Sequence, residues 1–316
     1  MHLSMARFSS AIACATDSAR SYWAQVWTGS VTPWPFAVFR IGVASVVLLR
    51  TTDLVAPWIS MEHHGFVVGL DHDSSREHLV GPRLWSPLWA WLPSGFVGVE
   101  HILAVLRTAL ALLLLVGFRP RAAAISLGIV GYVLMAFDRY RYLHHLHFLW
   151  ITCALIALTP CAERLSVDRW LGWTRREKLA PRWPLQVLRF QLVIAYVAAA
   201  VGKLNSAWLD GTVLVALERE GLVRGWLWTL LRDASGYAGA AVMVCALELL
   251  VPVLLISKRS RLIGIAAGIG LHAAISSMMV VFTFGVQMAL YLMLFLPWVP
   301  EGLRANDTVA KHAGSL

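Results

Sequence analysis

Between Leu188 and Leu204 the sequence reads LRFQLVIAYVAAAVGKL, an apolar run with an arginine near its start and a lysine at its end. Together with its flanking residues, the run has about the 20 residues that a helix needs to cross a hydrocarbon core of ~30 Å. Its alanines and glycine are typical of packed membrane helices, because small side chains let two backbones approach closely. This stretch therefore predicts a transmembrane helix with a polar stripe.

The rest of the chain has the same character. Its 316 residues are 58% hydrophobic and only 14% charged, whereas about a quarter of the residues in soluble domains are charged. Eight apolar segments are near the length of a membrane span, some of them shorter, at residues 35–52, 97–118, 121–137, 144–160, 184–204, 236–256, 261–280 and 282–298. The sequence predicts an all-α integral membrane protein, a bundle of about eight transmembrane helices.

The distribution of Lys and Arg predicts the orientation of this bundle. With the N-terminus in the cytoplasm, the inner connections contain 15 of these residues and the outer connections seven, in agreement with the positive-inside rule. We expect a protein of the cell (inner) membrane with both termini in the cytoplasm. The net charge of +9 is confined to short connections, and no basic stripe interleaved with aromatic residues indicates nucleic acid as a partner.

We expect three parts: a cytoplasmic amphipathic segment at 1–34, a transmembrane domain at 35–298 and a cytoplasmic tail at 299–316. Two long outer connections, 53–96 and 205–235, are rich in tryptophan. Such segments are predicted to lie at the membrane interface as amphipathic or re-entrant pieces. They could cover a cavity that opens to the outer face.

Lys203 is the first candidate for a functional residue. Arg189, Tyr196 and Lys203 follow one another at intervals of seven residues, which places them on one stripe of a helix. An amine in apolar surroundings is displaced toward its neutral, basic form, the form required of a general base. The alternative is that Lys203, near a helix end, extends to the lipid headgroups.

Histidines form the second candidate group. The run DRYRYLHHLH, from Asp138 to His147, enters the fourth segment from the outer side. Histidine transfers protons near neutral pH and is a common metal ligand, and His144 and His147 have the spacing of one helix face. No motif such as HExxH accompanies them, so we predict no metal site. The alternative is that these interfacial histidines only hydrogen-bond the nearby backbone.

Several of these residues match a known family. The matching segments are Ala37-Val38-Phe39-Arg40, Gly117-Phe118-Arg119, Asp138 to His147, Ser166-Val167-Asp168, the stretch from Leu188 through Lys203 and Trp208 to Gly211, and His272 with the span that follows it. On these residues the chain resembles the HTTM (horizontally transferred transmembrane) family, which includes the membrane part of vitamin K-dependent γ-carboxylase. The resemblance covers roughly residues 35–298.

This resemblance implies a specific chemistry. In the carboxylases, a lysine at the position matching Lys203 deprotonates reduced vitamin K, and His145 matches an active-site histidine. The implied cofactor is therefore a reduced quinone, vitamin K or menaquinol, and the implied acceptor a secreted peptide or protein. The same cavity would be lined or stabilised by Arg40, Arg189, Tyr196, His272, His144 and His147. Membrane lipid is the other expected partner.

Two departures from the carboxylases bear on the substrate. Gly202 stands where they have a second lysine. They also have a large lumenal domain after the membrane part, whereas here about 18 residues follow the last segment. Both departures argue against carboxylation of Glu-rich secreted proteins.

The favoured hypothesis is a carboxylase-like membrane lyase or quinol epoxidase, with Lys203 as the base and His145 assisting. The main alternative is a non-catalytic maturation factor for an exported peptide, similar to the B component of the sporulation-delaying toxin system. A transporter is disfavoured, because the sequence has neither internal repeats nor paired helices broken by Gly or Pro.

Overall fold

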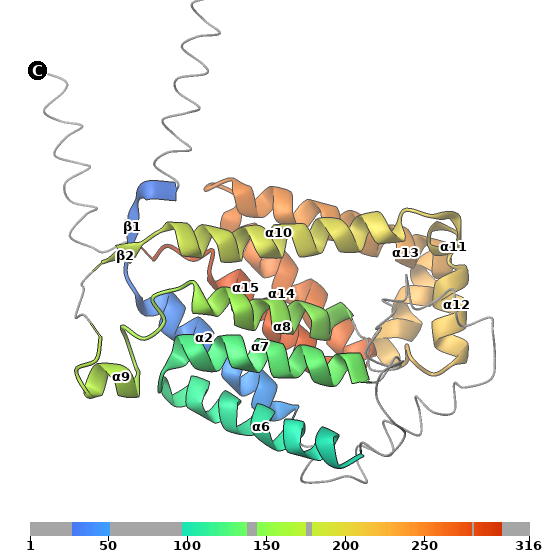
Figure 1. The fold of residues 1–316 in the computed structure, drawn as a ribbon. Coiled ribbons are helices and arrows are strands. Elements are labelled where there is room, and N and C mark those ends of the chain that lie inside the picture. The colour runs from blue at the N-terminus through green and yellow to red at the C-terminus, as the bar shows by residue number, and fades with distance from the viewer. Residues whose placement is uncertain (1–26, 51–96, 138–143, 175–178, 280, 299–316) are drawn as a thin grey trace, which may run out of the picture.

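The structure of the protein, a computed structural model, describes residues 27–50, 97–137, 144–174, 179–279 and 281–298 (Figure 1). Several predicted parts lie outside these residues: most of the N-terminal segment (1–26), the outer connection 53–96, the residues 138–143 and the C-terminal tail 299–316.

Within the described residues, eight helices of at least 12 residues make up the bundle. They are α2 (Trp34–Leu49), α6 (Val97–Val116), α7 (Pro120–Phe137), α8 (His144–Ala157), α10 (Trp183–Lys203), α13 (Trp226–Ile256), α14 (Arg261–Met278) and α15 (Phe282–Met293). Each overlaps one of the eight predicted segments, so the all-α architecture is confirmed.

Three of the described helices, α10, α13 and α14, are long and apolar enough to cross a membrane. The other five have shorter apolar stretches, Trp34–Leu49, Ile102–Val116, Pro120–Met135, His144–Ala157 and Thr283–Met293. Large apolar side chains also point outward from the bundle, among them Ile102, Val201, Val253 and Ile263, each about 60% exposed. Lipid suits such a surface and water does not. The protein is therefore an all-α membrane protein, and the count of eight spans stays a prediction.

The helices form two sets that join along α2 and α15. Helices α2, α6, α7 and α8 pack in sequence order, and so do α13, α14 and α15. Helix α15 returns to α2, while α10 packs against α13, α15 and α8. In Figure 1 the long helices run broadly side by side along the bundle, with α10 along its upper edge. Helix α10 thus contacts both sets.

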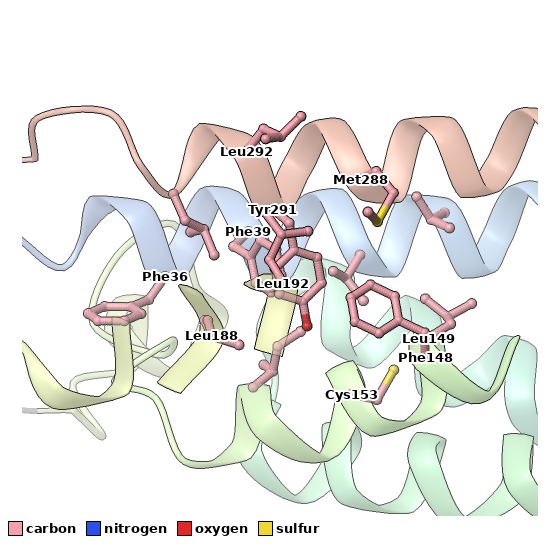
Figure 2. Close-up of a cluster of buried hydrophobic side chains, with 14 of the residues drawn as sticks. Phe36, Phe39, Phe148, Leu149, Cys153, Leu188, Leu192, Met288, Tyr291 and Leu292 are labelled. Atoms are coloured by element: carbon pink, nitrogen blue, oxygen red, sulfur yellow. The ribbon is translucent and has the colours of Figure 1, made fainter. Parts of the chain in front are cut away.

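Aromatic side chains fill the centre where these sets meet (Figure 2). The ring of Tyr291 on α15 lies 4.9 Å from the rings of Phe39 on α2 and Phe148 on α8. Its hydroxyl is 2.8 Å from the Thr152 hydroxyl, which also accepts a bond from Gln287. These polar groups are fully buried, and their bonds to one another avoid the cost of unpaired groups in an apolar interior.

The predicted outer connection 205–235 is folded onto one end of the bundle. It contains α11 (Ser206–Leu209), α12 (Thr212–Arg219) and the first ten residues of α13. Helix α13 breaks at Gly236, whose φ is 68°, and this is the residue at which the predicted span begins. Trp228 and Leu214 pack against Ala240 and Met278 in a small core of their own. We call α11, α12 and residues 226–235 the cap.

The opposite end of the bundle has a short helix and a strand pair. Helix α9 (Val167–Trp170) follows α8, and β1 (Ser30–Val31) pairs antiparallel with β2 (Ala180–Pro181). Figure 1 shows α9 and these strands at the left end and α11 and α12 at the right end. The two strands have two residues each, so they leave the fold class unchanged.

Candidate functional site

Lys203, the last residue of α10, forms an ion pair inside the cap end of the bundle. Its Nζ lies 2.9 Å from both carboxylate oxygens of Glu248 on α13 and donates to the carbonyl of Ala199 at 3.2 Å. The two side chains are only 19% and 10% exposed. The amine therefore points into the contact between α10 and α13.

The cap supplies an aromatic wall for this ion pair. The Lys203 Nζ lies 5.5 Å from the centre of the Trp208 ring on α11, within the range of a cation–π contact. Asn205 caps α11, because its side-chain oxygen accepts from the Trp208 backbone N–H at 3.1 Å. The end of α10 and the start of α11 thus position Lys203 and Trp208 together.

Gly202, the residue before Lys203, lies at an open position. No atom lies within 4 Å of where a Cβ would stand. The carboxylases have a second lysine here, and the backbone of this chain leaves space for a side chain at that point.

Tyr196 and His272 form a second polar pair, between α10 and α14. The Tyr196 hydroxyl is 2.9 Å from the His272 Nε2, and both side chains are buried. Gly268, one turn before His272, makes room for this hydroxyl, since a Cβ there would lie 3.1 Å from it. Tyr196 lies two turns before Lys203 on α10, so this pair and the ion pair follow one another along one face of the helix. We call these four residues, Tyr196, Lys203, Glu248 and His272, the Lys203 cluster.

One polar atom of the cluster has no hydrogen-bond partner among the described residues. The Nδ1 of His272 is buried and has no hydrogen-bond partner in the part of the chain that the structure describes. His272 is only 5% exposed, so bulk water does not satisfy this nitrogen. An unpaired buried nitrogen of this kind is a point at which a ligand can bind.

The three histidines at the start of α8 have different surroundings. The His145 ring lies 5.8 Å from the Phe284 ring, which in turn is 5.4 Å from the His272 ring. His147 instead bonds to Tyr132, and His144 is exposed. Of these three histidines, His145 is the one that contacts Phe284, and Phe284 in turn contacts His272 of the Lys203 cluster.

Arg40 and Arg189 lie at the other end of the bundle. The Arg40 guanidinium is fully buried and donates to the carbonyls of Cys161 and Leu165, which follow α8. Arg189 donates twice to the Leu294 carbonyl at the end of α15, at 2.6 and 2.9 Å. Since Arg189 precedes Lys203 by 14 residues, about 21 Å of helix separates them. The structure thus does not bring either arginine to the Lys203 cluster.

The sequence interpretation left Glu248 out of the candidate site. The signal available was its charge within an apolar span, because an ionised group there needs an ionic partner or a wet cavity. Which of several charged residues serves as that partner depends on which helices are neighbours, and the sequence does not state this. Among the described residues, no group of three or more His, Cys, Asp or Glu side chains is arranged to hold a metal ion.

Comparison with known proteins places this site in a family. No solved structure matches the chain. Residues 87–298, two thirds of the chain, match the family model described as the HTTM domain. The matched range includes the whole Lys203 cluster and His145, but not α2 with Arg40. The chain therefore belongs to the HTTM family of membrane proteins, as its sequence predicted.

Proposed function

We propose that the protein is a membrane enzyme in which Lys203 removes a proton from a reduced quinone and thereby starts the modification of a peptide or other polar acceptor. The observation that supports this most directly is the contact of the Lys203 amine with both oxygens of Glu248 inside the bundle. The same lysine matches the base of the carboxylases that the chain resembles.

The ion pair itself can prepare the base. Transfer of one proton from Nζ of Lys203 to the Glu248 carboxylate gives a neutral amine and a carboxylic acid, with no other group required. The transfer leaves two uncharged groups in contact, so it leaves no unpaired ion in the apolar interior. The free electron pair on Nζ then accepts a proton from a substrate hydroxyl.

A flat ring with hydroxyl groups would find aromatic and polar neighbours at the cluster. Trp208 lies near the Lys203 amine, and the Phe284 ring contacts the His272 ring. The unpaired Nδ1 of His272 can exchange a hydrogen bond with a hydroxyl. A bound quinol would supply the acidic hydroxyl and the electrons, and molecular oxygen would be the oxidant. His145, in contact with Phe284, would assist from the α8 side.

The cap suggests how an acceptor approaches. Its residue Trp208 contacts the Lys203 amine. In the orientation predicted from the Lys and Arg distribution, the cap faces outward. A peptide exported across the inner membrane would reach the cap from that side, while a quinol would enter from lipid. Both termini would lie in the cytoplasm.

The main competing function is a maturation factor that binds an exported peptide without catalysis. A satisfied intramembrane ion pair can fix the packing of α10 against α13 without reacting. The two functions differ in what they require of Lys203, because a binding protein needs only the shape of its binding surface and an enzyme needs the amine.

The test is an assay of the purified full-length protein with menaquinol or reduced vitamin K under oxygen, in which epoxide is followed by mass spectrometry. We expect epoxide from the natural protein and a loss of roughly 100-fold or more in Lys203→Ala, the usual contribution of a general base. Lys258→Ala is the control, because Lys258 is an exposed lysine outside the cluster.

Absence of epoxide from folded protein with several quinols would refute the quinol reaction. The maturation-factor function would then be favoured, and it predicts that Lys203→Ala retains peptide binding while changes in the cap abolish it.

A further inference from the structure

A hollow lies at the α9 end of the bundle, away from the Lys203 cluster. It has a volume of about 530 Å³ and lies between the start of α7, the segment after α8 and the residues that follow α9. Its polar lining is formed by Arg119, Arg121, Glu163, Asp168 and Thr174, with Trp173 as the aromatic wall. The proposed function makes no use of it.

Arg119 is held over this hollow by an unusual backbone conformation. Its φ is 43°, in the left-handed region that costs a residue with a side chain about 1 kcal/mol or more. Asp168 stabilises this conformation, because its Oδ1 accepts the Arg119 backbone N–H at 2.9 Å. The Arg119 guanidinium then lies 4.7 Å from the centre of the Trp173 ring. Such a contact restricts the group while its N–H edge stays available.

Three further donors converge on the same hollow. Within the described residues, Arg121 donates one long bond of 3.3 Å, from Nε to the Thr159 carbonyl. The Thr174 hydroxyl oxygen is buried without a partner in the described part of the chain. Helix α7, 18 residues long, begins at Pro120 with its N-terminus at the hollow, and the first N–H groups of a helix attract anions.

The two acidic residues of the lining do not cancel these charges. Asp168 already accepts the Arg119 N–H and interacts electrostatically with the buried Arg40. Glu163 has Arg169 beside it, since the Arg169 guanidinium donates to the Glu163 backbone carbonyl. With Arg164 and Arg169 close by in the sequence, this end of the bundle keeps an excess of positive charge.

We infer that this hollow binds a phosphate group. Guanidinium groups form paired hydrogen bonds with phosphate oxygens, and a helix N-terminus favours the same anion. The hollow is larger than a bare anion needs, and the neighbouring Trp170 is 83% exposed and Leu171 40%. Exposed tryptophans are typical of the membrane interface, so a phospholipid headgroup is the source that the surroundings favour. A soluble phosphate ester has the same chemistry and is the other source.

Native mass spectrometry of the full-length protein in detergent tests this inference. The probes are dioleoylphosphatidylglycerol, dioleoylphosphatidylcholine and inorganic phosphate. We expect phosphatidylglycerol to be retained at least tenfold better than phosphatidylcholine, and Arg119→Gln and Arg121→Gln to reduce its retention at least fivefold. Arg259→Gln is the matched control, since it removes one exposed arginine, in the α13–α14 turn, outside the hollow.

Each outcome decides the question. Saturable binding of inorganic phosphate that Arg121→Gln weakens, without retention of phosphatidylglycerol, supports the site with a soluble ester as its ligand. Equal retention of both lipids that Arg121→Gln leaves unchanged, together with no phosphate binding, overturns the inference, as does an Arg259→Gln effect as large as that of Arg121→Gln. If Arg119→Gln unfolds the protein, Arg121→Gln decides, and Arg121→Lys should restore part of the binding because it retains the charge.

Discussion

Lys203 and Glu248 are separated by 45 residues in the chain. In the folded protein, each charge lowers the free-energy cost of burying the other. A lone ion inside a bilayer costs several kcal/mol, and the contact removes much of that cost for both residues. The contact also explains why a lysine at a helix end turns inward: the carboxylate on α13 competes with the headgroups for its amine.

The first prediction concerns this pair. Glu248→Gln should destabilise the protein by roughly 3 kcal/mol, because it leaves the Lys203 charge buried without an ionic partner. Lys203→Met combined with Glu248→Gln should be less destabilised than the sum of the single variants, with a coupling of about 1 kcal/mol or more. Thermal unfolding in detergent measures both quantities. Effects that add within about 0.5 kcal/mol would show that the pair contributes no interaction energy.

At the scale of elements, a glycine lets α14 pack closely against α15 and beside Tyr196 of α10. A Cβ at Gly268 would lie 2.8 Å from Leu292 and 3.1 Å from the Tyr196 hydroxyl, whereas a Cβ at Gly270 would meet no atom within 4 Å. The two glycines are on one helix and differ only in what they face. They therefore make a matched pair for an experiment.

The second prediction is that Gly268→Ala lowers stability by about 1–3 kcal/mol, the range for overpacking a filled interior. It should also weaken the Tyr196–His272 bond and reduce any quinol-dependent activity. Gly270→Ala should leave stability unchanged or raise it slightly, because alanine favours helix over glycine. Unfolding midpoints of the two variants measured side by side test this prediction, and equal midpoints would contradict it.

The third prediction concerns the cap. Tyr237 and Arg232 on α13 both donate to the Glu218 carboxylate on α12. The hydrogen bond from Tyr237 is the largest cause that holds the pKa of Glu218 below its usual value. A lowered pKa means that the folded cap binds this proton less readily than the unfolded segment. The stabilisation is therefore complete at neutral pH and is lost as the pH falls below about 4.5 through the lowered pKa.

Hydrogen exchange in α12, corrected for intrinsic rates, measures this loss. Exchange should accelerate between about pH 6 and about pH 3.5 in the natural protein, as the carboxylate takes up its proton. In Glu218→Gln it should be fast at both values, because the amide cannot supply the ionised acceptor. An unchanged pH response in that variant would assign the effect to other groups.

At the scale of the whole molecule, the two polar sites lie at opposite ends of the bundle. The Lys203 cluster lies beneath the cap, and the arginine-lined hollow lies beside α9. From the positive-inside rule we expect the hollow to face the cytoplasm and the cap to face outside. This separation fits a protein that reacts with an exported acceptor on one face and contacts anionic lipid on the other.

The fourth prediction tests that orientation. The described cysteines Cys153, Cys161 and Cys245 are all buried, so a new cysteine can be labelled selectively once Cys14 is replaced by serine. Thr212→Cys, exposed at the start of α12, should react with a membrane-impermeant maleimide on intact cells. Arg259→Cys, in the α13–α14 turn, should react only after lysis. The opposite pattern would reverse the orientation.

The positions of the helices could be predicted from the local sequence. Hydrophobic length predicts where a span begins and ends, because the bilayer acts on each segment separately. The predicted start at residue 236 marks the Gly236 break and not the start of α13, since the ten residues before it are helical but belong to the cap. The sequence predicted an interfacial segment there. It did not predict the contacts of Trp228 and Trp208 that attach this segment to the bundle.

The sequence by itself determined that this is a helical membrane protein of the HTTM family, with Lys203 at the end of an apolar span. Only the tertiary structure decided that Glu248 is its partner, that Tyr196 pairs with His272, and that Arg40 and Arg189 serve the opposite end. The physical reason is that burial in lipid depends on the composition of one segment, whereas an ion pair depends on which segments become neighbours. In this bundle α10 packs against α13, and that contact creates the candidate site.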